Sequence, residues 1–191
     1  SWVADAERTA TLVVAYEGSA EKQAQQHATL QQMLDAAGCK EAMTLTGEPE
    51  REVYVALRDV PTVDAPVVLL SGRLHCLPSE AVELLTQVDT EAARRALPVA
   101  LHVHIGTGVT RLFVPGAHPP DVLAAFAQWV RARVAAHGGQ VVWEGLPAAL
   151  AAAIDPWGDG VSPAALTLMR GVKAAFDPQS ILSPGRYLGG I

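Results

Sequence analysis

The chain has 191 residues, of which 50% are hydrophobic and 18% are charged, so it contains enough apolar material for a substantial core. Its net charge of −6 excludes a basic stripe for nucleic acid, no apolar run approaches the roughly 20 residues that span a bilayer, and the N-terminus does not resemble a signal peptide. Cys39 and Cys76 have no paired spacing, so we expect reduced thiols in a cytoplasmic protein, with a disulfide between them left open.

The N-terminal third is predicted to form a β-α-β half-unit followed by a helix and a linker. Runs of β-branched and apolar residues predict its strands. Ser19 and Gly38 are typical first and last capping residues of a helix. The expected elements are a strand over 11–16, a helix over 20–37, a strand over 42–46, a short helix over 48–57 and a linker over 62–66.

The middle of the chain predicts the order β-α-β-β-α-β. The expected elements are a strand over 67–73, a helix from Ser79, strands over 99–105 and 109–114, a helix from Asp121 and a strand over 140–143. This order is that of a ferredoxin-like sandwich, with helices on one sheet face and the other face free. The predicted fold class is therefore α+β: this sandwich, the N-terminal β-α-β half-unit and a C-terminal helical tail.

A change in composition at Leu146 opens the C-terminal region. Residues 147–153 are rich in Ala and could form a helix or an irregular segment. The turn cluster over 155–160 contains Trp157, and exposed turns seldom carry Trp without a contact. We expect Trp157 either to pack against the final helix or to dock on a domain outside this chain.

A packed final helix and an exposed turn are predicted to end the chain. Ser162 can cap the helix, and Pro163 suits its first position. The helix should end near Phe176 because Pro178 disfavours helical geometry in the residue before it. Pro184-Gly185 then predicts a tight turn at which a backbone can approach a partner closely.

The same stretch resembles a known signature. Its residues are Met169-Arg170-x-x-Lys173-x-x-Phe176-Asp177-Pro178-x-x-Ile181-Leu182-Ser183-Pro184-Gly185-Arg186. This pattern resembles the C-terminal signature of FAD-linked oxidases of the vanillyl-alcohol oxidase type, and most of all that of bacterial glycolate oxidase flavin subunits. Ser183 stands where the family usually has Asn. The resemblance implies that Ser183, Pro184, Gly185 and Arg186 bind the cofactor as a loop near the flavin.

The resemblance also implies a division of the protein. Residues 1–145 would form the cap on the substrate side, and residues 146–191 would return to a FAD-binding domain. No glycine-rich loop of the form G-x-G-x-x-G appears, so we expect that domain, which would bind most of the FAD, to be absent from this chain. The full enzyme would oxidise a small 2-hydroxy acid such as glycolate or lactate. Its implied partners are an iron–sulphur subunit and a second flavin subunit, which could also attach it to the inner membrane.

The strand over 99–105 carries the candidate substrate-facing residues. Side chains alternate between the faces of a strand, so His102 and His104 share the side opposite to the apolar set, and Arg111 joins them from the next strand. An Arg could hold a carboxylate, and a His could bind or deprotonate a hydroxyl. The alternative is that all three are polar residues on a solvated sheet face.

No metal centre of the family type is expected. Some D-lactate and D-2-hydroxyglutarate dehydrogenases of the family contain a metal-binding stretch that resembles G-H-x-G-D-G-N-x-H, with a later Glu-His pair. Here its Asp, Asn and second His are replaced by Thr107, Val109 and Arg111, and Glu144 has no His beside it. Two histidines at i and i+2 rarely make a site by themselves.

A second class of function stays open from the sequence. A free-standing ferredoxin-like module for binding or assembly, without catalysis, would also lack a phosphate loop. Such a module does not account for the ordered residues of the C-terminal signature.

Overall fold

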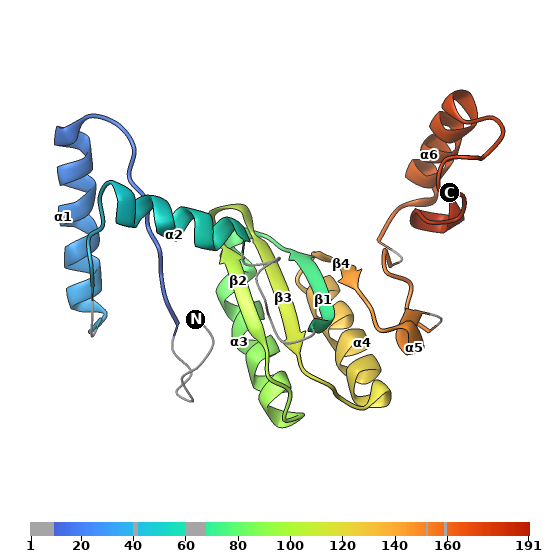
Figure 1. The fold of residues 1–191 in the computed structure, drawn as a ribbon, viewed down its shortest axis with the longest axis horizontal. Coiled ribbons are helices and arrows are strands. Elements are labelled where there is room, and N and C mark those ends of the chain that lie inside the picture. Colours follow the sequence, from blue (N-terminus) through green and yellow to red (C-terminus); the bar gives the residue numbers. More distant parts are fainter. Residues whose placement is uncertain (1–9, 40–41, 60–67, 152, 159) are drawn as a thin grey trace. The chain divides into compact units, whose positions relative to one another are not determined.

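The computed structural model describes residues 10–39, 42–59, 68–151, 153–158 and 160–191 (Figure 1). The chain divides into two compact units, residues 1–61 and 62–191. Its described residues combine helices with a four-stranded antiparallel sheet, which confirms the predicted α+β class. The predicted boundary between residues 145 and 146 stays a prediction.

The second unit contains the predicted β-α-β-β-α-β sandwich. Its elements are β1 (Val68–His75), α3 (Pro78–Arg94), β2 (Ala100–His104), β3 (Val109–Pro115), α4 (Pro120–Ala136) and β4 (Gln140–Gly145). The strands lie in the order β2-β3-β1-β4, and every neighbouring pair is antiparallel. Figure 1 shows α3 and α4 on the same face of this sheet. The opposite sheet face, called the open face below, is covered by neither helix.

The core lies between the sheet and these two helices. The fully buried side chains of the strands are Leu70, Leu74, Thr110, Leu112 and Val114, and those of the helices include Leu84, Val88, Leu123, Phe126, Val130 and Val134. Each large apolar side chain buried in this way contributes about 1.5–3 kcal/mol. Alternation along β3 places Arg111 and Phe113 on the open face, since Thr110, Leu112 and Val114 face the helices.

Both covering helices begin one residue earlier than expected. Pro78 and Pro120 occupy the first helical positions, where a proline's fixed φ suits the helix and its missing N–H costs nothing. Ser79 and Asp121 therefore lie inside the first turns. Trp129, on α4, packs partly buried against the core, with the Arg133 guanidinium 5.3 Å from its ring centroid.

In the N-terminal unit, the structure differs from the predicted β-α-β half-unit. Its described residues form α1 (Ala20–Ala36) and α2 (Glu48–Asp59), and neither expected strand, over 11–16 or over 42–46, is formed. A strand exists only where its backbone finds a hydrogen-bonding partner, and the described residues of this unit offer none to these segments. The apolar side chains of Leu12, Val13 and Val14 are accordingly exposed.

The predicted caps of α1 are confirmed, whereas the linker remains undescribed. The Ser19 hydroxyl accepts a hydrogen bond from the backbone N–H of Lys22, and Gly38 follows the helix with a φ of 69°. The second helix, α2, extends two residues beyond the predicted end at Leu57. The expected linker over 62–66 lies outside the described residues.

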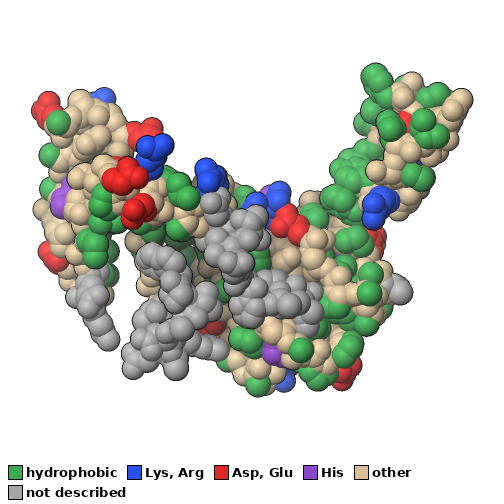
Figure 2. Space-filling model, in the orientation of Figure 1, with side chains coloured by type: hydrophobic (Ala, Val, Ile, Leu, Met, Phe, Trp, Pro, Cys, Tyr) green, Lys and Arg blue, Asp and Glu red, His purple; other side chains and the backbone are tan. Residues whose placement is uncertain are grey.

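The C-terminal region contains α5 (Ala148–Ala151), α6 (Pro163–Phe176) and a short 3-10 helix, η2 (Leu188–Gly190). As predicted, the Ser162 hydroxyl accepts the Ala165 N–H at 3.2 Å, and α6 ends at Phe176. The prediction that α6 is packed is wrong, because it has no buried residue. Leu168, Val172 and Phe176 are 73%, 60% and 83% exposed, and Figure 2 shows hydrophobic side chains gathered over this helix.

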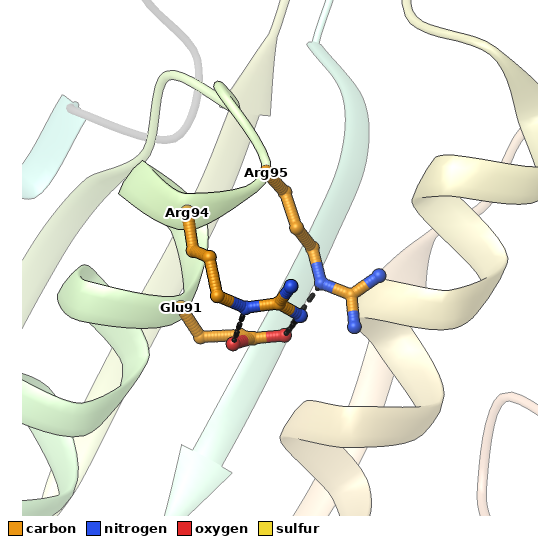
Figure 3. A network of polar contacts seen from close by, with 3 residues as sticks. All are labelled: Glu91, Arg94 and Arg95. Atoms are coloured by element: carbon orange, nitrogen blue, oxygen red, sulfur yellow. Dashed lines mark hydrogen bonds and ion pairs between the residues drawn. The ribbon is translucent and has the colours of Figure 1, made fainter.

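A buried carboxylate fixes the end of α3 (Figure 3). Glu91 accepts hydrogen bonds from Arg94 Nε at 2.8 Å, Arg94 Nη2 at 2.7 Å and Arg95 Nε at 2.6 Å. The hydrogen bonds from Arg94, joined by that from Arg95, outweigh burial and lower the pKa of Glu91 to about 2. The network closes the last turn directly before Ala96, whose φ is 53°.

Candidate functional site

The open face of the sheet brings the three substrate-facing candidates together. His102 on β2 lies directly opposite Arg111 on β3. The ring centroids of His102 and His104 are 5.0 Å apart. His102 and Arg111 are half-buried, whereas His104 is exposed. This arrangement follows from strand alternation and from the hairpin that joins β2 to β3.

His102 has a buried ring nitrogen without a partner. Its Nδ1 forms no hydrogen bond in the described part of the chain. Burial lowers the pKa of His102 below its ordinary value of 6.5, and the nearby His104 and Arg111 lower it further. The imidazole is therefore uncharged at neutral pH, and its unprotonated nitrogen can accept a proton. An unpaired buried polar atom is a position where a ligand would satisfy a hydrogen bond.

Sequence reasoning missed an ion pair on the same face. Arg73, on β1, lies directly opposite Arg111, and its Nη2 pairs with Oε1 of Glu144 on β4. The Nε of Arg73 is buried and has no partner among the described residues. Alternation within the predicted strand over 67–73 could have placed Arg73 on this face, whereas Glu144 lies one residue beyond the predicted strand over 140–143. Their meeting depends on β1 and β4 being neighbours, which no local pattern reveals.

Arg111 differs from Arg73 because no described carboxylate pairs with it. Its strand neighbour on this face is Phe113, which is half-buried and lies opposite Ala100 and Ser71. The open face thus joins an unpaired guanidinium, an uncharged imidazole and an aromatic ring. A guanidinium can bind a carboxylate through two parallel hydrogen bonds, so the set suits a small organic acid.

Lys173 and Asp177, two residues of the C-terminal signature, form the hydrogen bonds that stabilise the loop after α6. The Asp177 carboxylate is buried and accepts the backbone N–H groups of Ile181 at 2.9 Å and Leu182 at 3.0 Å. The Lys173 ammonium pairs with the same carboxylate at 2.6 Å and donates to the Leu182 carbonyl at 2.5 Å. The hydrogen bond from Lys173 is the main cause that lowers the pKa of Asp177. Lys173 and Asp177 therefore stabilise the conformation of this loop.

The predicted cofactor-binding residues form an exposed turn. Ser183 has a φ of 47° and Gly185 a φ of 69°, and the Arg186 N–H donates to the Ser183 carbonyl at 3.3 Å. Ser183, Pro184, Gly185 and Arg186 are all exposed, so the side chains and backbone of this turn are accessible to a partner. Asn adopts left-handed backbone more readily than Ser, which gives a physical reason for the Asn that is usual at this position.

Trp157, in the segment between α5 and α6, contacts this turn. Its indole N–H donates to the Arg186 carbonyl at 3.1 Å, and its ring makes an edge contact with Tyr187 at 4.6 Å between centroids. The contact partner is the tail after α6, which is neither of the two expected roles. The segment is itself attached to the sandwich, because the Trp143 N–H of β4 donates to the Pro156 carbonyl at 2.8 Å.

The tail also forms an open apolar groove of about 460 Å³. It is lined by Leu168, Met169, Val172, Lys173, Phe176, Asp177, Leu182, Tyr187 and Ile191. A contiguous apolar surface of this kind usually marks a contact with another protein surface.

The glycines between β2 and β3 do not form a phosphate loop. Gly108 has a φ of 66°, and a Cβ there would lie 1.9 Å from the Cys76 carbonyl oxygen. The Gly108 carbonyl accepts the Cys76 N–H at 3.0 Å, so this glycine is required by the hairpin turn. That Ser183, Pro184, Gly185 and Arg186 bind a cofactor stays a prediction, and the structure shows only that their turn is exposed.

The described residues contain no group of three or more His, Cys, Asp or Glu that could hold a metal ion. Within the described part of the chain, no helix is both long enough and apolar enough to cross a membrane. Cys39 and Cys76 are both thiols. Burial raises the pKa of the Cys76 thiol, and the nearby Glu80 raises it further.

The comparison with protein families gives a match along nearly the whole chain. A family model described as "FAD linked oxidases, C-terminal domain" matches residues 2–187. The matched range contains the sandwich, the open face and the Ser183 to Arg186 turn. No curated protein matches the chain.

Proposed function

The chain belongs to the family of FAD-linked oxidase C-terminal domains, and we propose that it forms the substrate-side wall of an enzyme that oxidises a small 2-hydroxy acid. Membership makes it part of an FAD-linked oxidoreductase. The substrate class is inferred from Arg111. Its guanidinium has no described carboxylate partner and lies beside an uncharged, half-buried histidine, His102. Glycolate and lactate are the simplest acids of this class.

Different residues of the open face can have separate roles in such an oxidation. Arg111 binds the substrate carboxylate and thereby fixes the position of the α-carbon. His102 accepts the hydroxyl proton, because its imidazole is uncharged at neutral pH. Phe113 borders this strip and helps to exclude water. Bound FAD would supply the acceptor for the hydride that leaves the α-carbon.

The tail supplies the second part of the proposal. Residues 1–145 form the cap, and residues 146–191 return to a FAD-binding domain, where Ser183, Pro184, Gly185 and Arg186 lie near the flavin. Support comes from the exposure of this turn and from the apolar groove beside it, which another protein surface would cover. In this arrangement most contacts to FAD come from the other domain.

The partners are proposed on the same basis. A bacterial glycolate oxidase type of complex would add an iron–sulphur subunit and a second flavin subunit, and it would lie in the cytoplasm or against the inner membrane. A non-catalytic assembly module explains less, because the family match includes both the sandwich and the tail.

Glycolate binding by the purified chain tests the substrate assignment. We expect glycolate to shift the imidazole NMR signals of His102, and Arg111→Gln to weaken this binding by at least about tenfold. Arg133→Gln, which removes the same charge from an exposed position on α4, a helix on the opposite sheet face, should leave the affinity unchanged. Equal affinities of the two variants would refute the assignment of the carboxylate to Arg111.

A further inference from the structure

The open face places two arginines directly opposite each other. Arg73 on β1 and Arg111 on β3 are partners in the strand register. Like charges at directly opposite positions destabilise a sheet. Glu144 relieves this repulsion, since its carboxylate pairs with Arg73. The two side chains of this pair are 40% and 35% exposed, so solvent screens the pair only in part.

Glu144 gives the two arginines different capacities for an anion. Arg73 is neutralised and its guanidinium is held in place, whereas Arg111 has no described carboxylate partner. His102, the opposite neighbour of Arg111 on β2, is uncharged at neutral pH. Arg111 is therefore the arginine on this face that remains available to bind one carboxylate.

Two unpaired nitrogens lie on either side of Arg111. The Nδ1 of His102 and the Nε of Arg73 are both buried and lack partners among the described residues. Their strands flank β3 in the sheet. A small ligand on Arg111 could satisfy His102, but an added carboxylate on the Arg73 side would meet the negative charge of Glu144.

We propose that Glu144 makes this site selective for substrates with a single carboxylate, by occupying Arg73 and repelling a second carboxylate. The inference rests on the proposed function, in which Arg111 binds the substrate acid. Glu144 is then a specificity-determining residue, acting through Arg73 and through its own charge.

Glycolate and tartronate are suitable probes, because both are 2-hydroxy acids and they differ by one carboxylate. In the wild-type chain at constant ionic strength, tartronate should bind no more tightly than glycolate, as followed by the imidazole signals of His102. In Glu144→Gln, Arg73 is released and the negative charge is gone, so tartronate should bind about tenfold more tightly than in the wild type. Glycolate affinity should change by less than about threefold.

Glu83→Gln is the matched control, since it removes the same charge from an exposed position on α3, away from the open face. It should not alter the ratio of the two affinities. Arg73→Gln is the complementary variant, because it leaves the Glu144 carboxylate unpaired on the same sheet face as Arg111, with only β1 between their strands. This change should weaken glycolate binding by about threefold or more.

The outcomes separate the two proposals. Glycolate binding that depends on Arg111, together with an unchanged tartronate-to-glycolate ratio in Glu144→Gln, overturns the role of Glu144 alone. Wild-type binding of tartronate about tenfold tighter than glycolate overturns it as well. If neither acid perturbs His102 in any variant, the proposed function and the role of Glu144 both fail.

Discussion

At Ser183 the backbone has a φ of 47°, a left-handed conformation that a Ser side chain adopts only at a cost. The residue begins the exposed turn that Arg186 closes through its N–H bond to the Ser183 carbonyl. Asn tolerates this conformation because its short polar side chain can bond to the local backbone. Having Ser in place of the usual Asn therefore affects the stability of the turn as well as the contacts that this side chain can make.

Ser183→Asn should stabilise the turn by about 0.5–1 kcal/mol, and Ser183→Val should destabilise it, because a β-branched side chain is strained at positive φ. Amide hydrogen exchange at Ile181 and Leu182, whose N–H groups bond to Asp177, reports this local change. Exchange should slow about two- to fivefold in the Asn variant. Faster exchange in Ser183→Asn than in the wild type would show that strain at this position is not limiting.

The positions of His102, His104 and Arg111 illustrate what strand alternation can reveal. Their common face follows from the two-residue period of a strand, so local sequence was sufficient to predict it. Arg73 and Glu144 reach the same face from strands that are distant in the sequence. Only the strand order places Arg73 opposite Arg111 and brings Glu144 to Arg73, which is why the ion pair could not be predicted.

Among the elements, α3 owes its end to a buried charge. Glu91 is 8% exposed, and its carboxylate is bound by Arg94 and Arg95. In the folded protein its pKa is lowered from 4.5 to about 2. A lowered pKa means that the stabilisation is fully present above about pH 4.5 and is lost as the pH falls toward about 2.

Glu91→Gln should lower the free energy of unfolding by about 2 kcal/mol at pH 7, because it removes charge-assisted hydrogen bonds. The difference from the wild type should shrink at about pH 3, because the Glu91 carboxyl of the unfolded wild-type chain, at its ordinary pKa of 4.5, is then mostly protonated. Urea unfolding followed by Trp fluorescence measures both values. Glu83→Gln on the same helix should have little effect at either pH, and a pH-independent deficit in Glu91→Gln would contradict the charged role of Glu91.

The predicted elements differ in how far local sequence determined them. The sandwich strands were predicted because each alternates or is apolar between clear turns, and each finds a partner in one sheet. The run over 11–16 has the same composition, but the described residues of its unit provide no partner strand. Composition reports that a segment suits a pleated surface, whereas pairing decides whether a strand exists.

At the scale of the whole molecule, the main unexplained surface is the apolar side of α6. Helical spacing correctly predicted the stripe of Leu168, Val172 and Phe176, but the stripe does not contact the core of this chain. We attribute its composition to a contact with the flavin-binding domain of the oxidoreductase. The sequence pattern could not distinguish a helix packed on its own core from one that packs on another domain.

Phe176→Ser tests this attribution. Because Phe176 is 83% exposed, the change should alter the thermal midpoint of the isolated chain by less than about 1 °C. In the assembled oxidoreductase it should lower the midpoint of FAD release by about 2–4 °C, since an apolar contact is lost. Val82→Ser, at a 63% exposed position on α3, is the control and should change neither midpoint. Identical behaviour of the two variants would rule out α6 as the docking surface.

We propose that the open face binds the carboxylate of a 2-hydroxy acid through Arg111. The most direct test is kcat/KM of the assembled oxidoreductase with glycolate or lactate. Arg111→Gln should reduce kcat/KM by about a hundredfold or more, whereas Arg133→Gln, on α4, should change it by less than about twofold. An Arg111→Gln enzyme that retains the wild-type kcat/KM would contradict the claim.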